Sequence, residues 1–168
     1  SEEAFAELMN QKAKEIGLTH SHFVNSTGWP DPNHLMTARD LAVMARRIIV
    51  DFPEYYHYFS EETFVFGGIK QGNRNPLLYK DFGADGLKTG HTDDAGFGLT
   101  ASTIRDGRRI IMVLNGLPSM QIRAEEGRRM ILVTGPSDYA VVLRHLVDRH
   151  AEWSWVTMQI VGRMARGA

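Results

Sequence analysis

The chain has 168 residues, of which 43% are hydrophobic and 23% are charged, and its formal net charge is −1. This composition is ordinary for one globular domain with a hydrophobic core, and it excludes a charge-driven preference for nucleic acid or an anionic membrane. No apolar run approaches the ~18 residues that a membrane span needs. The sequence contains no cysteine, which excludes thiol catalysis, disulfides and cysteine-ligated zinc. A helical pattern starts at once, so we expect no signal peptide in it.

The first third of the chain predicts two helices separated by a loop. Apolar residues recur at helical spacing over 3–16, and a glycine follows directly as a stop signal. The segment 19–34 is rich in Ser, Thr, Asn, Gly and Pro and predicts an ordered loop. Thr37 is placed to cap a helix over 38–51, and Asp40 at the third helical position completes a capping box.

The middle of the chain changes to strand patterns. Residues 62–78 predict a strand, a glycine-containing turn and a second extended piece. Strands are also predicted over 86–91, 96–104 and 108–117, the last two joined by an Asp-Gly turn. Because these connections are short, the strands should pair in antiparallel fashion.

Two further helices are expected after the strands. Ser119 opens one over 120–133. Ser137 caps another, amphipathic helix, whose apolar side comprises Tyr139, Val142, Leu143, Leu146 and Val147. The predicted fold class is therefore α+β, an antiparallel sheet with packed helices.

The predicted strand over 86–91 contains the sequence Lys-Thr-Gly-His. At a strand edge, the ammonium of Lys88 and the hydroxyl of Thr89 can together hold a carboxylate. Gly90 lets a ligand approach the backbone closely, and the N–H of His91 points to where an oxyanion would form. An extended peptide can lie along such an edge as an added strand. The alternative interpretation is a surface strand with a solvated lysine.

The surrounding motifs resemble those of the serine-type D-alanyl-D-alanine carboxypeptidases, the low-molecular-mass penicillin-binding proteins of the β-lactamase-like superfamily. The resemblance runs through "FAELMNQKAKEIGLTHSHFVNSTGW", "MTARDLAVMARRII", "FGGIKQGNRNPLLYKDFGADGLKTGHTDDAGFGLTAS" and "IRAEEGRRM", in the family's order. It implies that residues 1–130 are the C-terminal part of a catalytic domain with a partial β-lactamase/transpeptidase-like fold. Residues 131–168 then form a divergent helical tail.

The resemblance also implies roles for individual residues. The family's catalytic Lys-Thr-Gly element and its following histidine match Lys88, Thr89, Gly90 and His91. The family's two arginines that surround the terminal carboxylate of the peptide match two further positions, Arg74 in "NRN" and Arg123 in "RAEE".

Both arginines also have a purely structural interpretation. Arg74, between two asparagines in a turn, is then a solvated loop cation. Arg123 is then a charge on a helix surface that pairs with Glu125 or Glu126.

The family's nucleophile, a serine three residues before a lysine, has no counterpart in these 168 residues. At that distance before the five lysines stand Met9, Gln11, Gly67, Leu77 and Asp85. No serine is followed two positions later by asparagine, so the family's Ser-x-Asn element is missing as well. Without an activated hydroxyl, covalent serine catalysis cannot begin. We therefore expect a truncated catalytic domain whose exposed apolar surface pairs with a complementary N-terminal half or with a second copy of the chain.

The function implied by the resemblance is recognition of D-Ala-D-Ala peptides or β-lactams within a serine acyl-transfer family. It implies a periplasmic or extracytoplasmic location and no cofactor. Two alternatives remain open. One is a non-catalytic oligomeric module that keeps the fold remnant. The other is a small β-lactamase or esterase with a relocated nucleophile, for which Ser102 and Ser119 are the candidates.

Two other clusters contain residue types that occur in functional sites. His20 and His22 form a His-x-His pair of the kind that binds metals, but they lie in a stretch shared with the non-metal family, so we expect no metal. Asp93 and Asp94 are adjacent on the chain, and adjacent strand side chains point to opposite faces. We interpret them as turn residues.

Overall fold

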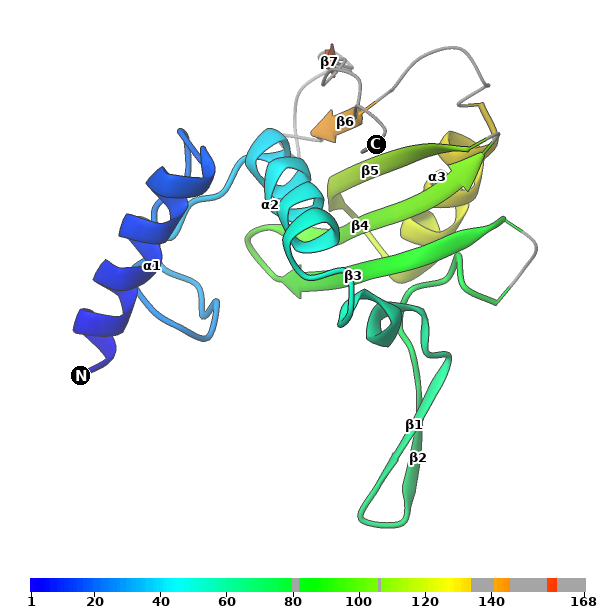
Figure 1. Ribbon diagram of the computed structural model, residues 1–168, viewed down its shortest axis with the longest axis horizontal. Coiled ribbons are helices and arrows are strands. Elements are labelled where there is room, and N and C mark those ends of the chain that lie inside the picture. Colours follow the sequence, from blue (N-terminus) through cyan, green and yellow to red (C-terminus); the bar gives the residue numbers. More distant parts are fainter. Residues whose placement is uncertain (80–81, 106, 134–140, 146–156, 160–168) are drawn as a thin grey trace.

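A mixed sheet with helices packed on it forms the centre of the protein (Figure 1). The computed structural model describes residues 1–79, 82–105, 107–133, 141–145 and 157–159. Within these residues the sheet order is β3-β4-β5-β6-β7, with bounds Ala84–Thr92, Gly96–Arg105, Arg108–Leu117, Val141–His145 and Thr157–Gln159. The sheet and its helices agree with the predicted α+β class.

The first three strands of this sheet confirm the antiparallel prediction. Strand β3 pairs with β4, and β4 pairs with β5, each in antiparallel register. Asp93 and Asp94 lie in the turn between β3 and β4, as interpreted from the sequence. Strand β6 pairs with β5 in parallel, through Val113, Leu114 and Asn115 of β5. The sheet is therefore mixed rather than purely antiparallel.

The helix predicted after Ser137 is wrong where the structure describes it, because Val142 and Leu143 lie in strand β6. A short apolar run does not distinguish a helix from a buried strand. Here the segment forms a strand because the backbone N–H and C=O groups along the edge of β5 need hydrogen-bond partners. Tyr139, Leu146 and Val147 lie outside the described residues. The division at residue 130 stays a prediction.

The first two helices follow the predicted ranges, with one change in the capping. Ser1 caps helix α1 (Glu2–Ile16), and Thr37 caps α2 (Ala38–Asp51) through its Oγ1, which accepts from the Asp40 N–H at 3.2 Å. The predicted capping box is wrong, because the Asp40 carboxylate turns to the loop that precedes α2. Its Oδ2 accepts the His20 N–H and the Ser21 hydroxyl, each at 2.8 Å.

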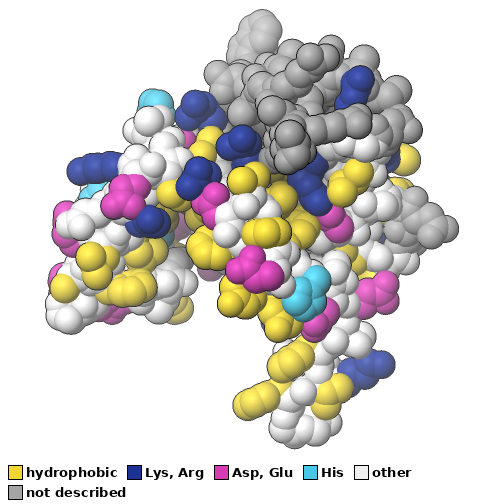
Figure 2. Space-filling view, in the orientation of Figure 1, with side chains coloured by type: hydrophobic (Ala, Val, Ile, Leu, Met, Phe, Trp, Pro, Cys, Tyr) yellow, Lys and Arg dark blue, Asp and Glu magenta, His cyan; other side chains and the backbone are white. Residues whose placement is uncertain are grey.

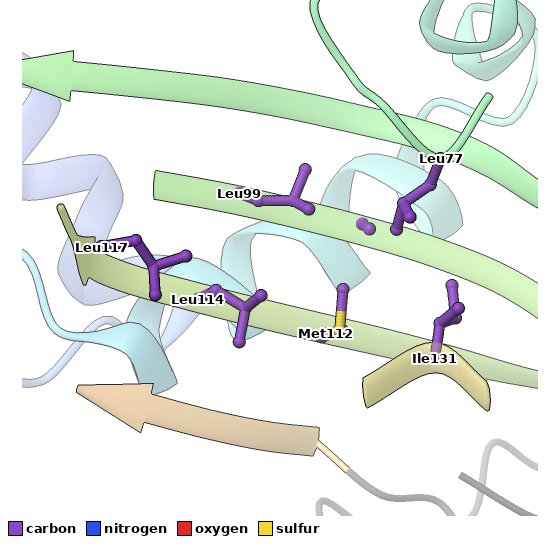
Figure 3. Close-up of a cluster of buried hydrophobic side chains, with 7 residues drawn as sticks. Leu77, Leu99, Met112, Leu114, Leu117 and Ile131 are labelled. Carbon is purple, nitrogen blue, oxygen red and sulfur yellow. The ribbon is translucent and has the colours of Figure 1, made fainter. Parts of the chain in front are cut away.

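Two apolar layers fill the faces of the sheet. Residues alternate along β5, so Ile111 and Val113 face one layer with Ala42 and Ala45 of α2. The opposite layer packs beneath α3 (Met120–Val133) and comprises Leu77, Leu99, Ala101, Met112, Leu114, Leu117 and Ile131 (Figure 3). Full burial of one such leucine stabilises the fold by about 1.5–3 kcal/mol. This second layer fixes α3, and with it Arg123, against the sheet.

Two parts of the chain extend away from this centre (Figure 1). Helix α1 lies beside α2 rather than on the sheet, and its Phe5 and Leu8 are 53% and 59% exposed. The hairpin of β1 (Thr63–Phe66) and β2 (Ile69–Gly72) follows the short helix η1 (Tyr56–Ser60) and projects outward with its apolar side chains exposed (Figure 2). Among the described residues, no helix combines the length and apolar character needed to cross a membrane.

Candidate functional site

The Lys-Thr-Gly-His sequence lies on β3, an edge strand of the sheet. Thr89 is buried, with 7% of its surface exposed, whereas Lys88 and Gly90 are exposed. A Cβ added at Gly90 would meet no atom within 4 Å. The strand prediction is confirmed, and the space beside Gly90 is open enough for a ligand to approach the backbone.

The side chain of Lys88 has no acidic partner among the ion pairs of the described residues. Its Nζ donates instead to the Thr89 carbonyl at 2.6 Å. An ammonium carries three donors and satisfies only one of them this way. The remaining donors are available to an oxygen-rich ligand at the strand edge.

An aromatic and cationic stack connects His91 to the helix behind the sheet. The ring of His91 stacks on Phe97, with centroids 3.9 Å apart, and β3–β4 pairing places these residues opposite each other. The guanidinium of Arg123 lies 5.8 Å from the Phe97 centroid, within the range of a cation–π contact. Sequence reasoning missed Phe97. The three-residue turn at 93–95 was the signal that would have paired it with His91.

Arg123 lies inside the protein and is not the helix-surface cation of the alternative interpretation. Only 6% of its surface is exposed. Glu126 pairs with Arg129 at 2.7 Å, and Glu125 accepts from the side chain of Gln121. The alternative that paired Arg123 with these two glutamates is therefore wrong.

The second arginine lies close to the first. Arg123 Nη2 donates to the Arg74 carbonyl oxygen at 3.3 Å, while Arg123 Nε has no hydrogen-bond partner among the described residues. Desolvation, and then the charge of Arg74, lower the pKa of Arg123 from its ordinary value. Both causes penalise an unpaired buried cation, so the arrangement favours a bound anion.

The turn that carries Arg74 is held by the two asparagines beside it. Asn75 is fully buried, at 0% exposure, whereas Arg74 is exposed. Asn73 Oδ1 accepts the Asn75 N–H at 2.9 Å, and Asn75 Nδ2 donates to the Gly86 carbonyl of β3 at 2.8 Å. The turn therefore presents the Arg74 side chain outward from an anchored backbone.

A polar cluster holds the first half of β3. Arg109 Nη1 lies 2.7 Å from Asp85 Oδ2 and donates to Ser102 Oγ at 2.6 Å. Tyr56 donates its hydroxyl to Asp85 Oδ1 at 3.0 Å, and the Arg109 guanidinium lies 5.0 Å from the Tyr56 ring centroid. The cluster joins three strands and η1. No local pattern in the sequence indicates it.

The candidate relocated nucleophiles are engaged in structural contacts. Ser102 is 1% exposed and accepts from Arg109, and Ser119 Oγ accepts the Ile122 N–H at the start of α3. Neither placement presents an activated hydroxyl to a substrate. Within the described residues there is also no group of three or more histidine and acidic side chains arranged to hold a metal ion.

Comparison with known proteins assigns the chain to a family. Residues 1–118 match the family described as D-alanyl-D-alanine carboxypeptidase. The chain belongs to this family. It is 44% identical over 128 residues to the D-alanyl-D-alanine carboxypeptidase DacD of Escherichia coli, a match that covers 76% of the chain and 33% of the relative. It is 42% identical over 129 residues to DacA of Haemophilus influenzae, again with 76% and 33% covered.

Solved structures of the family superpose on the chain. The carboxypeptidase DacD from Francisella tularensis matches with a TM-score of 0.73 and 29% identity, covering 79% of this chain and 45% of that one. Penicillin-binding protein 6B from Escherichia coli matches with a TM-score of 0.71 and 36% identity, covering 94% of this chain and 49% of that one. The chain spans about a third of the length of the curated relatives it matches.

Proposed function

We propose that this chain binds the terminal carboxylate of D-Ala-D-Ala peptides or of β-lactams at the edge of β3, as one part of a serine carboxypeptidase site. Two family relatives are named D-alanyl-D-alanine carboxypeptidases, and one solved relative is a penicillin-binding protein. In this proposal Lys88, Thr89 and Arg74 hold the carboxylate, Arg123 adds positive charge, and the N–H of His91 contributes to oxyanion stabilisation.

The unpaired cations beside the open strand edge carry the proposal. Among the described residues, none of the ion pairs includes Lys88, Arg74 or Arg123. Arg123 is nearly buried as well, and a buried charge without a partner is costly. A carboxylate ligand removes that cost, and an extended peptide with a free carboxylate also fits an edge strand.

The catalytic part of the proposal requires elements outside the 168 residues. Ser-x-x-Lys and Ser-x-Asn are missing from the 168 residues, and we propose that a complementary N-terminal half supplies the nucleophile and its base. Phe5 and Leu8 of α1 are large apolar side chains left half-exposed, and we propose that this half covers them. The non-catalytic oligomeric module is the second candidate, because the same exposed side chains also suit contact between two copies.

A titration followed by NMR tests carboxylate binding. N-acetyl-D-Ala-D-Ala is added to the 168-residue chain, and the same dipeptide as its C-terminal amide serves as the ligand control. We expect binding of the acid to exceed binding of the amide and to weaken by about tenfold in Lys88→Ala. Lys70→Ala, on the exposed hairpin strand β2, is the matched control and should bind like the wild type. Equal binding of acid and amide would contradict the proposal.

Labelling with a fluorescent penicillin tests the division of the active site. The chain alone should remain unlabelled, and addition of a polypeptide that carries the Ser-x-x-Lys and Ser-x-Asn elements should produce labelling of that added polypeptide. Label attached to the 168-residue chain itself would show that it holds its own nucleophile. A discrete oligomer that binds neither ligand would favour the non-catalytic module.

A further inference from the structure

A single buried amide connects the turn that carries Arg74 to the strand that carries Lys88. Asn75 follows Arg74 directly and has no exposed surface. Its Nδ2 donates to the Gly86 carbonyl at 2.8 Å, and its Oδ1 accepts the Leu77 N–H at 3.1 Å. The side chain thus bonds both to its own turn and to β3, two residues before Lys88.

The turn side of this connection is anchored separately. Asn73 Oδ1 accepts the Asn75 N–H at 2.9 Å, and Asn73 Nδ2 donates to the Glu61 carbonyl at 3.0 Å. Tyr79 adds its hydroxyl, which donates to the Asn73 carbonyl at 2.6 Å. The backbone on either side of Arg74 therefore has little freedom to move independently of Asn75.

The strand side is anchored just as closely. A Cβ added at Gly86 would lie 2.6 Å from Tyr56 Oη, so the strand passes against that phenol with no room for a side chain. Tyr56 also donates to Asp85, which pairs with Arg109. With both sides anchored, the bond from Asn75 to Gly86 sets the spacing between the turn and the strand.

We propose that Asn75 is a positioning residue, which fixes Arg74 at the distance from Lys88 at which both cations reach one carboxylate. This inference rests on the proposed function and identifies what orients its site. The chemistry requires asparagine, because only its amide offers a donor to Gly86 and an acceptor to Leu77 at this length. Aspartate has the same shape but no donor, and it would place an oxygen against the Gly86 carbonyl oxygen.

A double-mutant cycle tests the proposal, with the Kd of the full 168-residue chain for N-acetyl-D-Ala-D-Ala as the readout. Asn75→Asp should weaken binding by about five- to tenfold in the wild-type background. In the Arg74→Ala background the same substitution should change the Kd less than about twofold, because the group that it positions is gone. A merely structural role would weaken binding equally in both backgrounds, and that result would overturn the inference.

Asn10→Asp is the matched control for loss of an amide hydrogen bond. Asn10 lies on α1 and also uses both ends of its amide. Its Nδ2 donates to the Phe23 carbonyl at 2.7 Å, and its Oδ1 accepts the Phe23 N–H at 2.8 Å. Its substitution should leave the Kd unchanged. If Asn75→Asp does not fold, Asn75→Ser, which also removes the bond to Gly86, replaces it in the cycle.

The outcomes separate the inference from the function on which it rests. If Arg74→Ala weakens binding and Asn75→Asp weakens it equally in both backgrounds, the positioning role is refuted and the carboxylate site stands. If Arg74→Ala leaves the Kd unchanged, Arg74 does not bind the carboxylate. The proposed function then fails at this residue, and the inference fails with it.

Discussion

Replacing Arg109 with alanine is the substitution for which the structure predicts the largest effect on stability through charge. One nitrogen, Nη1, lies 2.7 Å from Asp85 Oδ2 and 2.6 Å from Ser102 Oγ. The side chains of Arg109 and Asp85 are 16% and 31% exposed. Their ion pair therefore lies between the buried and the solvent-exposed cases.

The expected cost follows from these placements. Breaking a buried ion pair costs about 3–5 kcal/mol, and an exposed pair contributes about 0–1 kcal/mol. For the intermediate exposure of this pair we expect about 2 kcal/mol, and Ser102, which is 1% exposed, adds about 1 kcal/mol for its lost donor. Arg109→Ala should lower the free energy of unfolding by about 3 kcal/mol. In urea unfolding the midpoint should fall with little change in slope.

Arg47→Ala is the matched control for this experiment. Arg47 pairs with Asp51 at the same 2.7 Å, but across one turn of α2, with side chains 42% and 27% exposed. Such helix pairs contribute about 0.3–0.5 kcal/mol. Asp85→Asn combined with Arg109→Ala should cost less than the sum of the two single changes, because the pair is shared. Equal losses for Arg109→Ala and Arg47→Ala would refute the reasoning.

Three further predictions concern the sheet and two elements that pack against it. Gly96→Ala should lower the free energy of unfolding by about 2 kcal/mol or more, because φ is 66° and a Cβ would lie 2.9 Å from the Leu117 carbonyl oxygen. In the same urea assay Gly107→Ala, where φ is 72° but the space is open, should cost about 1 kcal/mol. Burial raises the pKa of the Tyr56 phenol above its ordinary value of 10.0, so the unfolded chain loses this proton at lower pH than the folded chain. The free energy of unfolding should therefore fall as pH rises beyond 10.0, by up to ~1.4 kcal/mol per pH unit. Urea unfolding of Tyr56→Phe on both sides of pH 10.0 should lack this contribution. Arg123→Leu should unfold at no lower urea concentration than the wild type and should bind N-acetyl-D-Ala-D-Ala at least tenfold more weakly by NMR titration. Clear destabilisation would contradict the view of Arg123 as a cation buried without an acidic partner.

The parts of the fold that sequence reasoning predicted are those with local signals. The helix α2 has an apolar stripe and a threonine cap, and both features lie within its own 14 residues and the one before them. The strands β3, β4 and β5 are joined by short turns, so their order and antiparallel pairing follow from chain continuity. The placement of Lys88 and His91 on one edge strand follows from the same pattern.

What sequence reasoning missed depends on contacts between distant segments. Asp85 and Arg109 are 24 positions apart, and nothing in either neighbourhood indicates the other. Asp40 has the right position for a capping box, yet the fold brings His20 and Ser21 to its carboxylate instead. The Val-Val-Leu run of β6 has no hydrophobic period that distinguishes a strand from a helix, and it becomes a strand by pairing with the edge of β5. In each case the correct partner is determined by tertiary structure and not by the local sequence.

Arg123 connects the stability of the fold with the proposed function. Its α3 neighbours Glu125 and Glu126 are both close in sequence, but they bond to Gln121 and Arg129, and Arg123 turns inward to Phe97 and the Arg74 carbonyl. A core position filled for stability alone favours an apolar side chain, because a buried guanidinium without an acidic partner costs free energy. A stabilising Arg123→Leu would therefore show that the sequence sacrifices stability at this position. Residues that do so are typical of functional sites, and the carboxylate of the proposed ligand would supply the acidic partner that Arg123 lacks.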